Sequence, residues 1–162
     1  MKSLGTRTLA LAAALLLVAG GAIGWALARG DATPTAERES LAATNKPEGA
    51  KGKTLGLSRV VVPGGAELAL HHHEGTQIAF IDRGTLTYTV VEGSVEVRKG
   101  PADGDSKLVR KIKAGETGKI KTGQWIVEQR SDHHMAANRG DQKIVIYLST
   151  LLDQGAPPST PG

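Results

Sequence analysis

From Thr54 to Leu152 the chain alternates between apolar and polar residues over short stretches, the pattern of β-strands with one buried face. Turns containing Gly or Asp separate these stretches. The pattern predicts ten strands: Leu55–Val62, Ala66–His73, Gln77–Arg83, Thr85–Glu92, Ser94–Arg98, Lys107–Lys113, Gly118–Lys121, Gln124–Arg130, His133–Asn138 and Gln142–Leu151. No stretch between them has the period of an amphipathic helix, so we expect an all-β sandwich or barrel.

The first 28 residues read as a targeting segment. Lys2 and Arg7 precede an apolar run of about 20 residues, which is long enough to span a bilayer. The run ends in Ala26-Leu27-Ala28, which has the form of a cleavage site. The segment predicts either a cleaved signal peptide or an uncleaved N-terminal membrane anchor with a transmembrane helix. In both cases the protein is secreted or anchored to the outer face of the cytoplasmic membrane.

The segments on either side of the β-rich region predict little order. Residues 29–53 carry almost no large apolar side chain and predict a disordered linker, in which Glu37–Ala43 is a candidate short helix. Residues 153–162 hold three of the seven prolines and predict a disordered tail. The sequence thus predicts one folded domain over residues 54–152.

Composition excludes some classes of function. The net charge of +4 falls to +2 beyond residue 28, where 18 Lys and Arg face 16 acidic residues. Aromatic residues make up only 3% of the chain, so we expect no stacking platform and no nucleic-acid partner. The absence of Cys excludes disulfides, and stability must come from packing or from a bound metal.

Two histidines give the strongest chemical signal. His71 and His73 are two positions apart on a predicted strand and therefore point to the same face. Two imidazoles on one face form half of a metal site. His134 supplies a distant third imidazole. Its neighbour His133 is the rival, because strand alternation allows only one of the two to face a common pocket.

The spacing of these residues resembles the cupin family. Its first motif is matched by Gly65, His71, His73, Gln77 and Gly84, with Gln77 where the family usually has Glu. Its second motif is matched by Gly123, His134 and Asn138, with Gln129 and Ser131 in place of the usual Pro and Gly.

The resemblance covers residues 54–152 and implies a double-stranded β-helix, a jelly-roll barrel with a pocket in its mouth. It also implies a divalent metal (Fe, Mn, Ni, Zn or Cu) bound by His71, His73 and His134, with Gln77 as a weak fourth ligand. Cupins often pair through sheet edges, so a homodimer is an implied assembly.

The substitution at Gln77 leaves three interpretations open. Its carbonyl oxygen is a neutral, weak ligand, which would leave the full charge on the metal. Its amide could instead donate a hydrogen bond from outside the coordination sphere. Otherwise the residue only lines a barrel that has lost its metal. Glu128 and Asp132 could orient a histidine or act as a base, and the sequence does not decide between this and surface ion pairs.

Three hypotheses about function follow. The first is a metal-dependent dioxygenase, isomerase or lyase acting on a small molecule. The second is a non-catalytic module that binds or senses a small ligand or a metal at the cell surface. The third is a structural β-barrel whose histidine cluster is vestigial and binds no metal.

Overall fold

The computed structural model describes residues 34–101 and 104–162 of the chain. Twelve β-strands and no helix occur in these residues, and nothing in them is a candidate membrane-spanning helix. The strands are β1 (Glu37–Thr44), β2 (Lys53–Val62), β3 (Glu67–His72), β4 (Gly75–Arg83), β5 (Thr85–Glu92), β6 (Ser94–Lys99), β7 (Lys107–Lys113), β8 (Thr117–Lys121), β9 (Gln124–Glu128), β10 (His133–Ala137), β11 (Ile144–Asp153) and β12 (Thr160–Pro161). The all-β prediction is confirmed, and each of the ten predicted strands overlaps one of β2 to β11.

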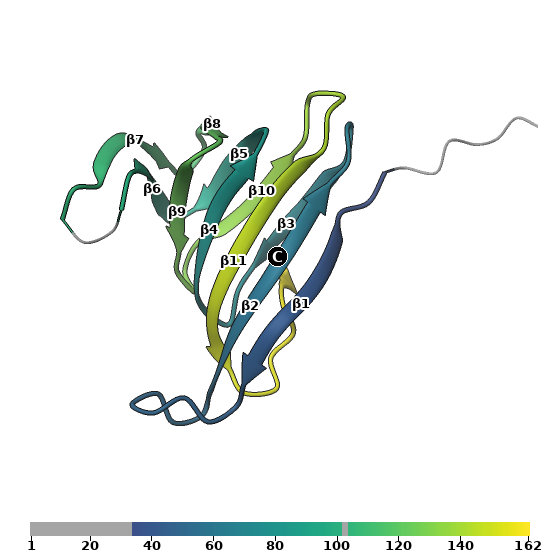
Figure 1. The fold of residues 1–162 in the computed structure, drawn as a ribbon. Helices are drawn as coiled ribbons and strands as arrows, with labels where there is room; N and C mark the ends of the chain where they lie inside the picture. Colours follow the sequence, from purple (N-terminus) through teal and green to yellow (C-terminus); the bar gives the residue numbers. More distant parts are fainter. Residues whose placement is uncertain (1–33, 102–103) are drawn as a thin grey trace, which may run out of the picture. The chain divides into compact units, whose positions relative to one another are not determined.

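The strands form two antiparallel sheets that face each other (Figure 1). The larger sheet has the order β1-β2-β11-β4-β9-β6-β7, and the smaller has the order β12-β3-β10-β5-β8. Strands far apart in sequence lie side by side in both sheets, as β11 does between β2 and β4. Residues separated by fifty or more positions therefore reach the same interior space.

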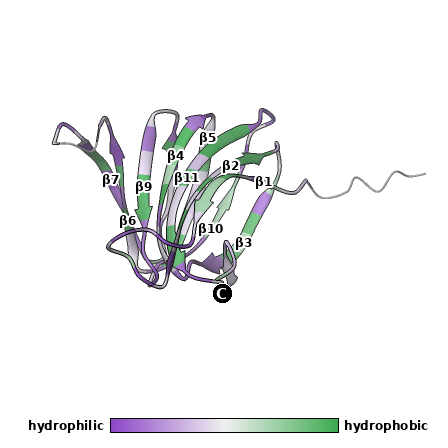
Figure 2. Ribbon diagram, turned by 60° about the horizontal axis from the view of Figure 1, so that its bottom comes forward, coloured by the Kyte–Doolittle hydropathy of each residue, from purple (hydrophilic) through white to green (hydrophobic). Residues whose placement is uncertain are grey.

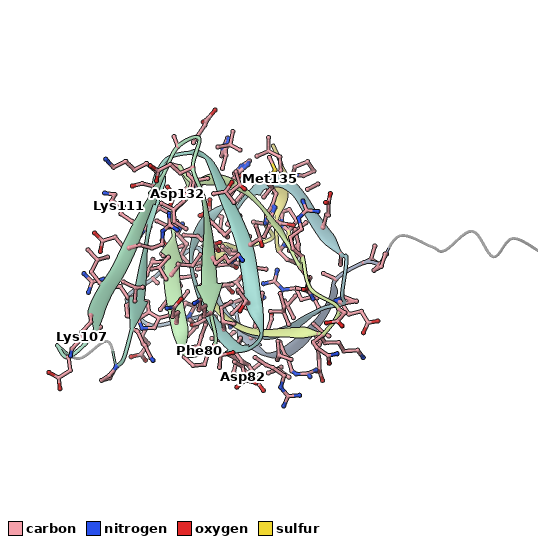
Figure 3. The ribbon with its side chains drawn as sticks, turned by 90° about the horizontal axis from the view of Figure 1, so that it is seen from above. Phe80, Asp82, Lys107, Lys111, Asp132 and Met135 are labelled. Carbon is pink, nitrogen blue, oxygen red and sulfur yellow. The ribbon has the colours of Figure 1, made fainter. Side chains whose placement is uncertain are left out.

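Alternating burial explains how each sheet forms. In β4, Ala79 and Ile81 are buried, whereas the alternate residues Phe80 and Asp82 lie on the outside, as Figure 3 shows. The buried residues of both sheets join in one core dominated by Val and Ile. Hydropathy drawn on the ribbon shows apolar strand segments joined by mostly polar loops (Figure 2). The core thus forms between the two sheets, as the alternating pattern predicted.

The prediction of a disordered linker is wrong for β1. This strand pairs with β2 from Glu37↔Val61 to Thr44↔Leu55, with one bulge between Ser40 and Ala42. The candidate helix at Glu37–Ala43 is wrong for the same reason. All eight residues of β1 are exposed, so main-chain hydrogen bonds to a neighbouring strand, rather than apolar burial, hold the segment.

The prediction of a disordered C-terminal tail is also wrong. β12 pairs with β3 through Thr160↔His72 and Pro161↔His71, and the Gly162 N–H donates to the Leu70 carbonyl. Proline favours the extended backbone seen here, and its lack of an N–H is tolerated at a sheet edge. The terminal segment therefore forms the edge of the smaller sheet, beside the strand that carries the candidate histidines.

The predicted signal peptide or membrane anchor at residues 1–28 lies outside the described residues, as do residues 29–33 of the predicted linker. The export segment and the first part of the linker therefore remain predictions.

Candidate metal centre

Three histidines converge inside the barrel. His71 and His134 are direct partners in the pairing of β3 with β10, and His73 follows the end of β3. Their ring centroids lie 4.3 Å apart for His71 and His134, 5.1 Å for His71 and His73, and 5.3 Å for His73 and His134. One potential ligand atom from each ring lies within 4.8 Å of the others. The structure thus brings together the three imidazoles that the spacing predicted.

Gly75 sets the bend that follows His73. Its N–H donates to the His73 carbonyl at 2.8 Å. A Cβ at this position would lie 2.2 Å from the Leu151 carbonyl oxygen of the neighbouring strand β11, so no larger residue fits. The chain can therefore turn directly from the histidine strand into β4.

Each histidine is held by a main-chain carbonyl through the same ring nitrogen. The Nδ1 atom of His71 donates to Ala69 O at 2.7 Å, and that of His73 donates to Pro158 O at 2.8 Å. The Nδ1 atom of His134 donates to Asp132 O at 3.2 Å. A carbonyl only accepts, so Nδ1 carries a proton in all three rings, and whenever a ring is neutral its Nε2 keeps the lone pair. This fixes the tautomer in which Nε2 can bind a metal.

Glu128 lies between two of these Nε2 atoms. The residue is 2% exposed, and its Oε1 lies 3.2 Å from His134 Nε2 while its Oε2 lies 3.6 Å from His73 Nε2. Two atoms that bind one ion at about 2.1 Å lie roughly 3.0–3.4 Å apart at right or tetrahedral angles. The Oε1–His134 Nε2 distance falls within this range, and the Oε2–His73 Nε2 distance lies just above it.

Gln77 faces Glu128 across the pairing of β4 with β9, in which the two residues are direct partners. The Gln77 amide nitrogen donates to Glu128 Oε2, and it also lies 2.9 Å from His73 Nε2. An ionised carboxylate only accepts, so the NH₂ group must face it and the Gln77 oxygen must point elsewhere. That buried oxygen has no hydrogen-bond partner in the described part of the chain. This orientation fits the interpretation of Gln77 as a donor outside the coordination sphere.

The surroundings of Glu128 keep it ionised. Burial acts to raise its pKa, but attraction to the His134 and His73 rings in their protonated form, together with the hydrogen bonds from Gln77 and Tyr88, outweighs burial and lowers the pKa. Tyr88 OH donates to Glu128 Oε1 at 2.8 Å. Burial first, and then the charge of Glu128, raise the pKa of Tyr88 well above its ordinary value, so the phenol stays protonated. The site therefore contains one fixed negative charge.

Two of the histidines are neutral near pH 7. Burial is the main cause that lowers the pKa of His71 to about 4, and the nearby His134 and His73 rings lower it further. Burial also lowers the pKa of His73, with Glu128 opposing the shift. Neutral imidazoles are the form that binds metals.

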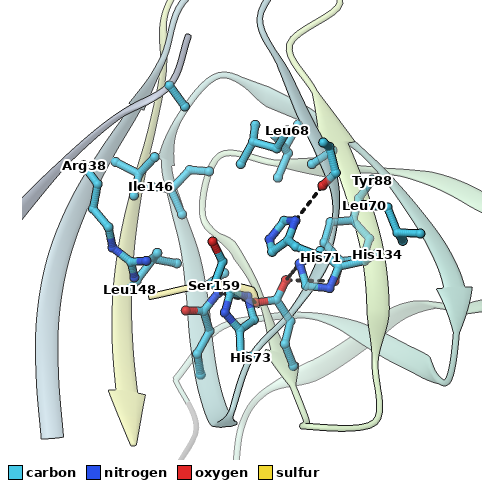
Figure 4. Close-up of a pocket in the computed structure, with 18 of the residues that line it drawn as sticks. Arg38, Leu68, Leu70, His71, His73, Tyr88, His134, Ile146, Leu148 and Ser159 are labelled. Carbon is cyan, nitrogen blue, oxygen red and sulfur yellow. Dashed lines mark hydrogen bonds and ion pairs between the residues drawn. The ribbon is translucent and has the colours of Figure 1, made fainter. Parts of the chain in front are cut away.

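The cluster opens into a cavity of about 410 Å³, shown in Figure 4. This volume lies near the lower end of the range of small-molecule sites. Most of the cavity wall is apolar and comes from both sheets, with Leu68 and Leu86 on one side and Ile146 and Leu148 on the other. Arg38 of β1 completes the wall. A small molecule bound here would contact the cluster directly.

The remaining candidates lie outside the cluster. His72 and His133 stack on each other with ring centroids 4.7 Å apart, and neither lines the cavity. The Asp132 side chain accepts from the N–H groups of Gln129 and Ser94 and so holds the turn before β10.

Asn138 is buried but does not join the histidines. Its amide donates to the carbonyls of Val62 and Gln142 and accepts from Gly140 N–H. It therefore holds the loop that follows β10, and the second motif contributes only His134 to the cluster.

Comparison with known proteins supports the fold. No protein-family model matches the sequence, and no curated protein is significantly similar to it. Several of the solved structures that it resembles are named as cupins, and the described part of the chain has the cupin fold.

One similar structure is the cupin domain of Cnp3 from Schizosaccharomyces pombe, with 17% identity, a TM-score of 0.50, and coverage of 74% of this chain and 66% of that chain. A cupin 2 domain-containing protein from Halorhodospira halophila has 12% identity and a TM-score of 0.51, with 79% and 70% covered. The DMSP lyase DddQ from Ruegeria pomeroyi has 12% identity and a TM-score of 0.51, with 78% of this chain and 51% of that chain covered. This chain therefore spans about half of the DddQ chain.

Proposed function

We propose that the domain binds one divalent metal ion through His71, His73, His134 and Glu128, beside a small organic molecule held in the cavity. The observation that carries this proposal is the protonation pattern of the cluster. Main-chain carbonyls use all three Nδ1–H groups, and each imidazole places a ligand atom within 4.8 Å of the other two. The Glu128 carboxylate lies 3.2 Å from His134 Nε2 and 3.6 Å from His73 Nε2.

The protein offers too few hydrogen-bond donors to satisfy the Nε2 atoms and the Glu128 carboxylate. Gln77 and Tyr88 are the side chains that donate to Glu128 in the described part of the chain. The Nε2 atoms of His71 and His134 receive no hydrogen bond from described residues. Converging lone pairs around a buried carboxylate repel one another unless a cation lies between them. A set of imidazole and carboxylate donors suits Fe, Mn, Ni, Zn or Cu.

The protein's own residues have distinct tasks in this arrangement. Main-chain carbonyls fix the three imidazoles, and Gln77 and Tyr88 fix the carboxylate. Apolar side chains form most of the cavity wall beside the cluster. A bound divalent metal would supply Lewis-acid polarisation or redox chemistry. The reaction class is therefore a metal-dependent dioxygenation, isomerisation or elimination, and the neighbour DddQ is itself named a lyase.

A non-catalytic binding or sensing module is the second candidate. One observation favours it: with Glu128 bound to the metal, no other acidic side chain lines the cavity within the described residues. A reaction that needs a free carboxylate base would then lack one. Such a module would return its ligand unchanged after prolonged incubation, which chromatography of the released ligand would show.

Metal analysis of the purified full chain tests the proposal. We expect close to one equivalent of a divalent metal in the wild type and almost none in His71→Ala or His134→Ala. The matched controls are His72→Ala and His133→Ala, which remove neighbouring imidazoles from outside the cluster. Equal metal contents in His134→Ala and His133→Ala would refute the proposed centre.

We also propose that the domain acts outside the cytoplasm, because residues 1–28 have the pattern of an export signal. Fractionation of the cells that produce the protein tests this location, and a wholly cytosolic protein would contradict it.

A further inference from the structure

The cavity contains a charged group that the proposed metal centre does not use. Arg38 is the cationic side chain among the described residues that line the cavity, and Glu128 is the acidic one. Arg38 lies on β1 directly opposite Val60 of β2, whose side chain is buried at the cavity wall. Directly opposed residues of an antiparallel pair point to the same face, so Arg38 lines the cavity, although the residue as a whole is exposed on this edge strand. Figure 4 shows it on the side of the cavity that also carries Leu148.

The guanidinium group is nearly free of protein partners. Its hydrogen bond within the described chain is to Pro158 O at 3.4 Å, which is long for a bond of this type. No acidic side chain of the described residues forms an ion pair with it. An arginine offers five N–H donors in a planar fork that matches a carboxylate. Most of these donors remain available to a ligand.

Arg38 also lies close to the histidines. The Pro158 carbonyl accepts from both Arg38 and His73 Nδ1, so the guanidinium lies within two hydrogen-bond lengths of the His73 ring. An anionic group bound by Arg38 would therefore lie in the same cavity as the three histidines, on the Nδ1 side of the His73 ring. The apolar walls would contact the rest of the molecule.

The charges of the site agree with an anionic ligand. With neutral imidazoles, Arg38 and Glu128 cancel each other, and a divalent metal leaves the cavity with a net charge of about +2.

We infer that the cavity binds a small organic anion, with a carboxylate or similar planar anionic group on Arg38 and an apolar body against the barrel wall. This inference rests on the proposed metal centre and names the class of its ligand. Arg38 is a binding residue in this assignment, and it comes from the segment that the sequence predicted to be a linker with a candidate short helix.

Matched probes test the inference. Hexanoate and hexanamide have the same apolar body and differ in charge, and ligand-detected NMR gives their dissociation constants for the zinc-loaded full chain. A charged pair with arginine contributes a discrimination of about 10- to 100-fold. We expect the wild type to prefer hexanoate by at least about 10-fold, Arg38→Gln to lose this preference, and Arg38→Lys to keep part of it.

Arg59→Gln is the control. Arg59 is the neighbour of Val60 on β2, pairs with Glu39, and does not line the cavity. It should keep the full preference for hexanoate. If Arg38→Gln binds hexanoate as tightly as the wild type does, the metal alone holds the carboxylate and the inference is overturned. Equal affinity of the wild type for both probes would also overturn it.

Metal content measured on the same samples separates the two proposals. A sample that loads zinc fully but shows no preference refutes the anionic ligand and leaves the metal centre intact. A wild-type sample that takes up no zinc refutes the metal centre instead.

Discussion

Replacing Glu128 by Gln removes the only negative charge that lines the cavity among the described residues while keeping the shape of the side chain. The carboxylate is already buried, so its desolvation is complete before a metal arrives. Two unit charges about 4 Å apart attract by ~4 kcal/mol at an effective dielectric constant of 20, and a divalent ion doubles this value. Water reaching the metal through the open cavity reduces the gain. We therefore expect Glu128→Gln to weaken metal binding by about 3 to 4 kcal/mol, or 10²- to 10³-fold.

Because Gln77 and Glu128 are direct partners, exchanging the two side chains should restore the metal affinity that Glu128→Gln loses. In the double variant Gln77→Glu, Glu128→Gln the carboxylate moves to β4 and the amide moves to β9, directly opposite each other. We expect the exchange to restore most of the affinity, because both positions face the histidines. Gln77→Glu alone places two carboxylates in contact, so one must take up a proton, and the metal-free domain should unfold at a lower temperature.

Competition with a chromophoric zinc chelator measures the affinities, and calorimetry measures the stability of the metal-free proteins. Wild-type affinity in Glu128→Gln would show that this carboxylate is not a ligand. A large loss that the double variant fails to restore would show that the two positions are not equivalent, which would refute the argument from strand pairing.

Three further predictions concern the same structure. Deleting residues 1–33 should leave the melting temperature of the domain unchanged, whereas deleting residues 1–52 removes β1 and should lower it, since β2 loses one of its two neighbouring strands. The metal-free domain should lose stability as the pH falls from about 6.5 towards the His71 pKa of about 4, because the unfolded chain binds the proton more readily there, and urea unfolding at several pH values measures this loss. Tyr88→Phe leaves Glu128 without one donor and should destabilise the fold by about 1–3 kcal/mol, which thermal or urea unfolding at pH 7 would show; an unchanged stability would contradict the hydrogen bond described here.

The alternating strands and the pair His71 and His73 were predictable because their signals are local, whereas His134 was predicted from the spacing of the second cupin motif. The alternation of apolar and polar residues in β2 to β11 indicates which side chains are buried. The two-residue spacing of His71 and His73 indicates that their side chains share a face. The sequence of β1 shows no apolar–polar alternation of this kind, because its eight residues are all exposed and main-chain hydrogen bonds to β2 hold the strand in place. The pattern therefore missed Arg38.

Placing Glu128 beside the histidines requires the register between β4 and β9, which the sequence alone does not reveal. Glu128 is 51 positions from Gln77, and only the pairing of β4 with β9 makes the two residues neighbours. The sequence offered Glu128 as a candidate without deciding its role. The missing Glu at position 77 was the available signal, because it raised the question of which other acidic residue could reach the same space.

Because Pro158 accepts a hydrogen bond from His73, proteolytic loss of the C-terminal residues would affect the candidate metal centre. β12 has two residues and pairs with β3 alone, so its detachment disturbs far less structure than the loss of any central strand would. A protease that trims the chain ahead of Pro158 would free the His73 ring and leave the Val and Ile core untouched. Two preparations of one gene product would then differ in metal occupancy while giving the same circular dichroism spectrum.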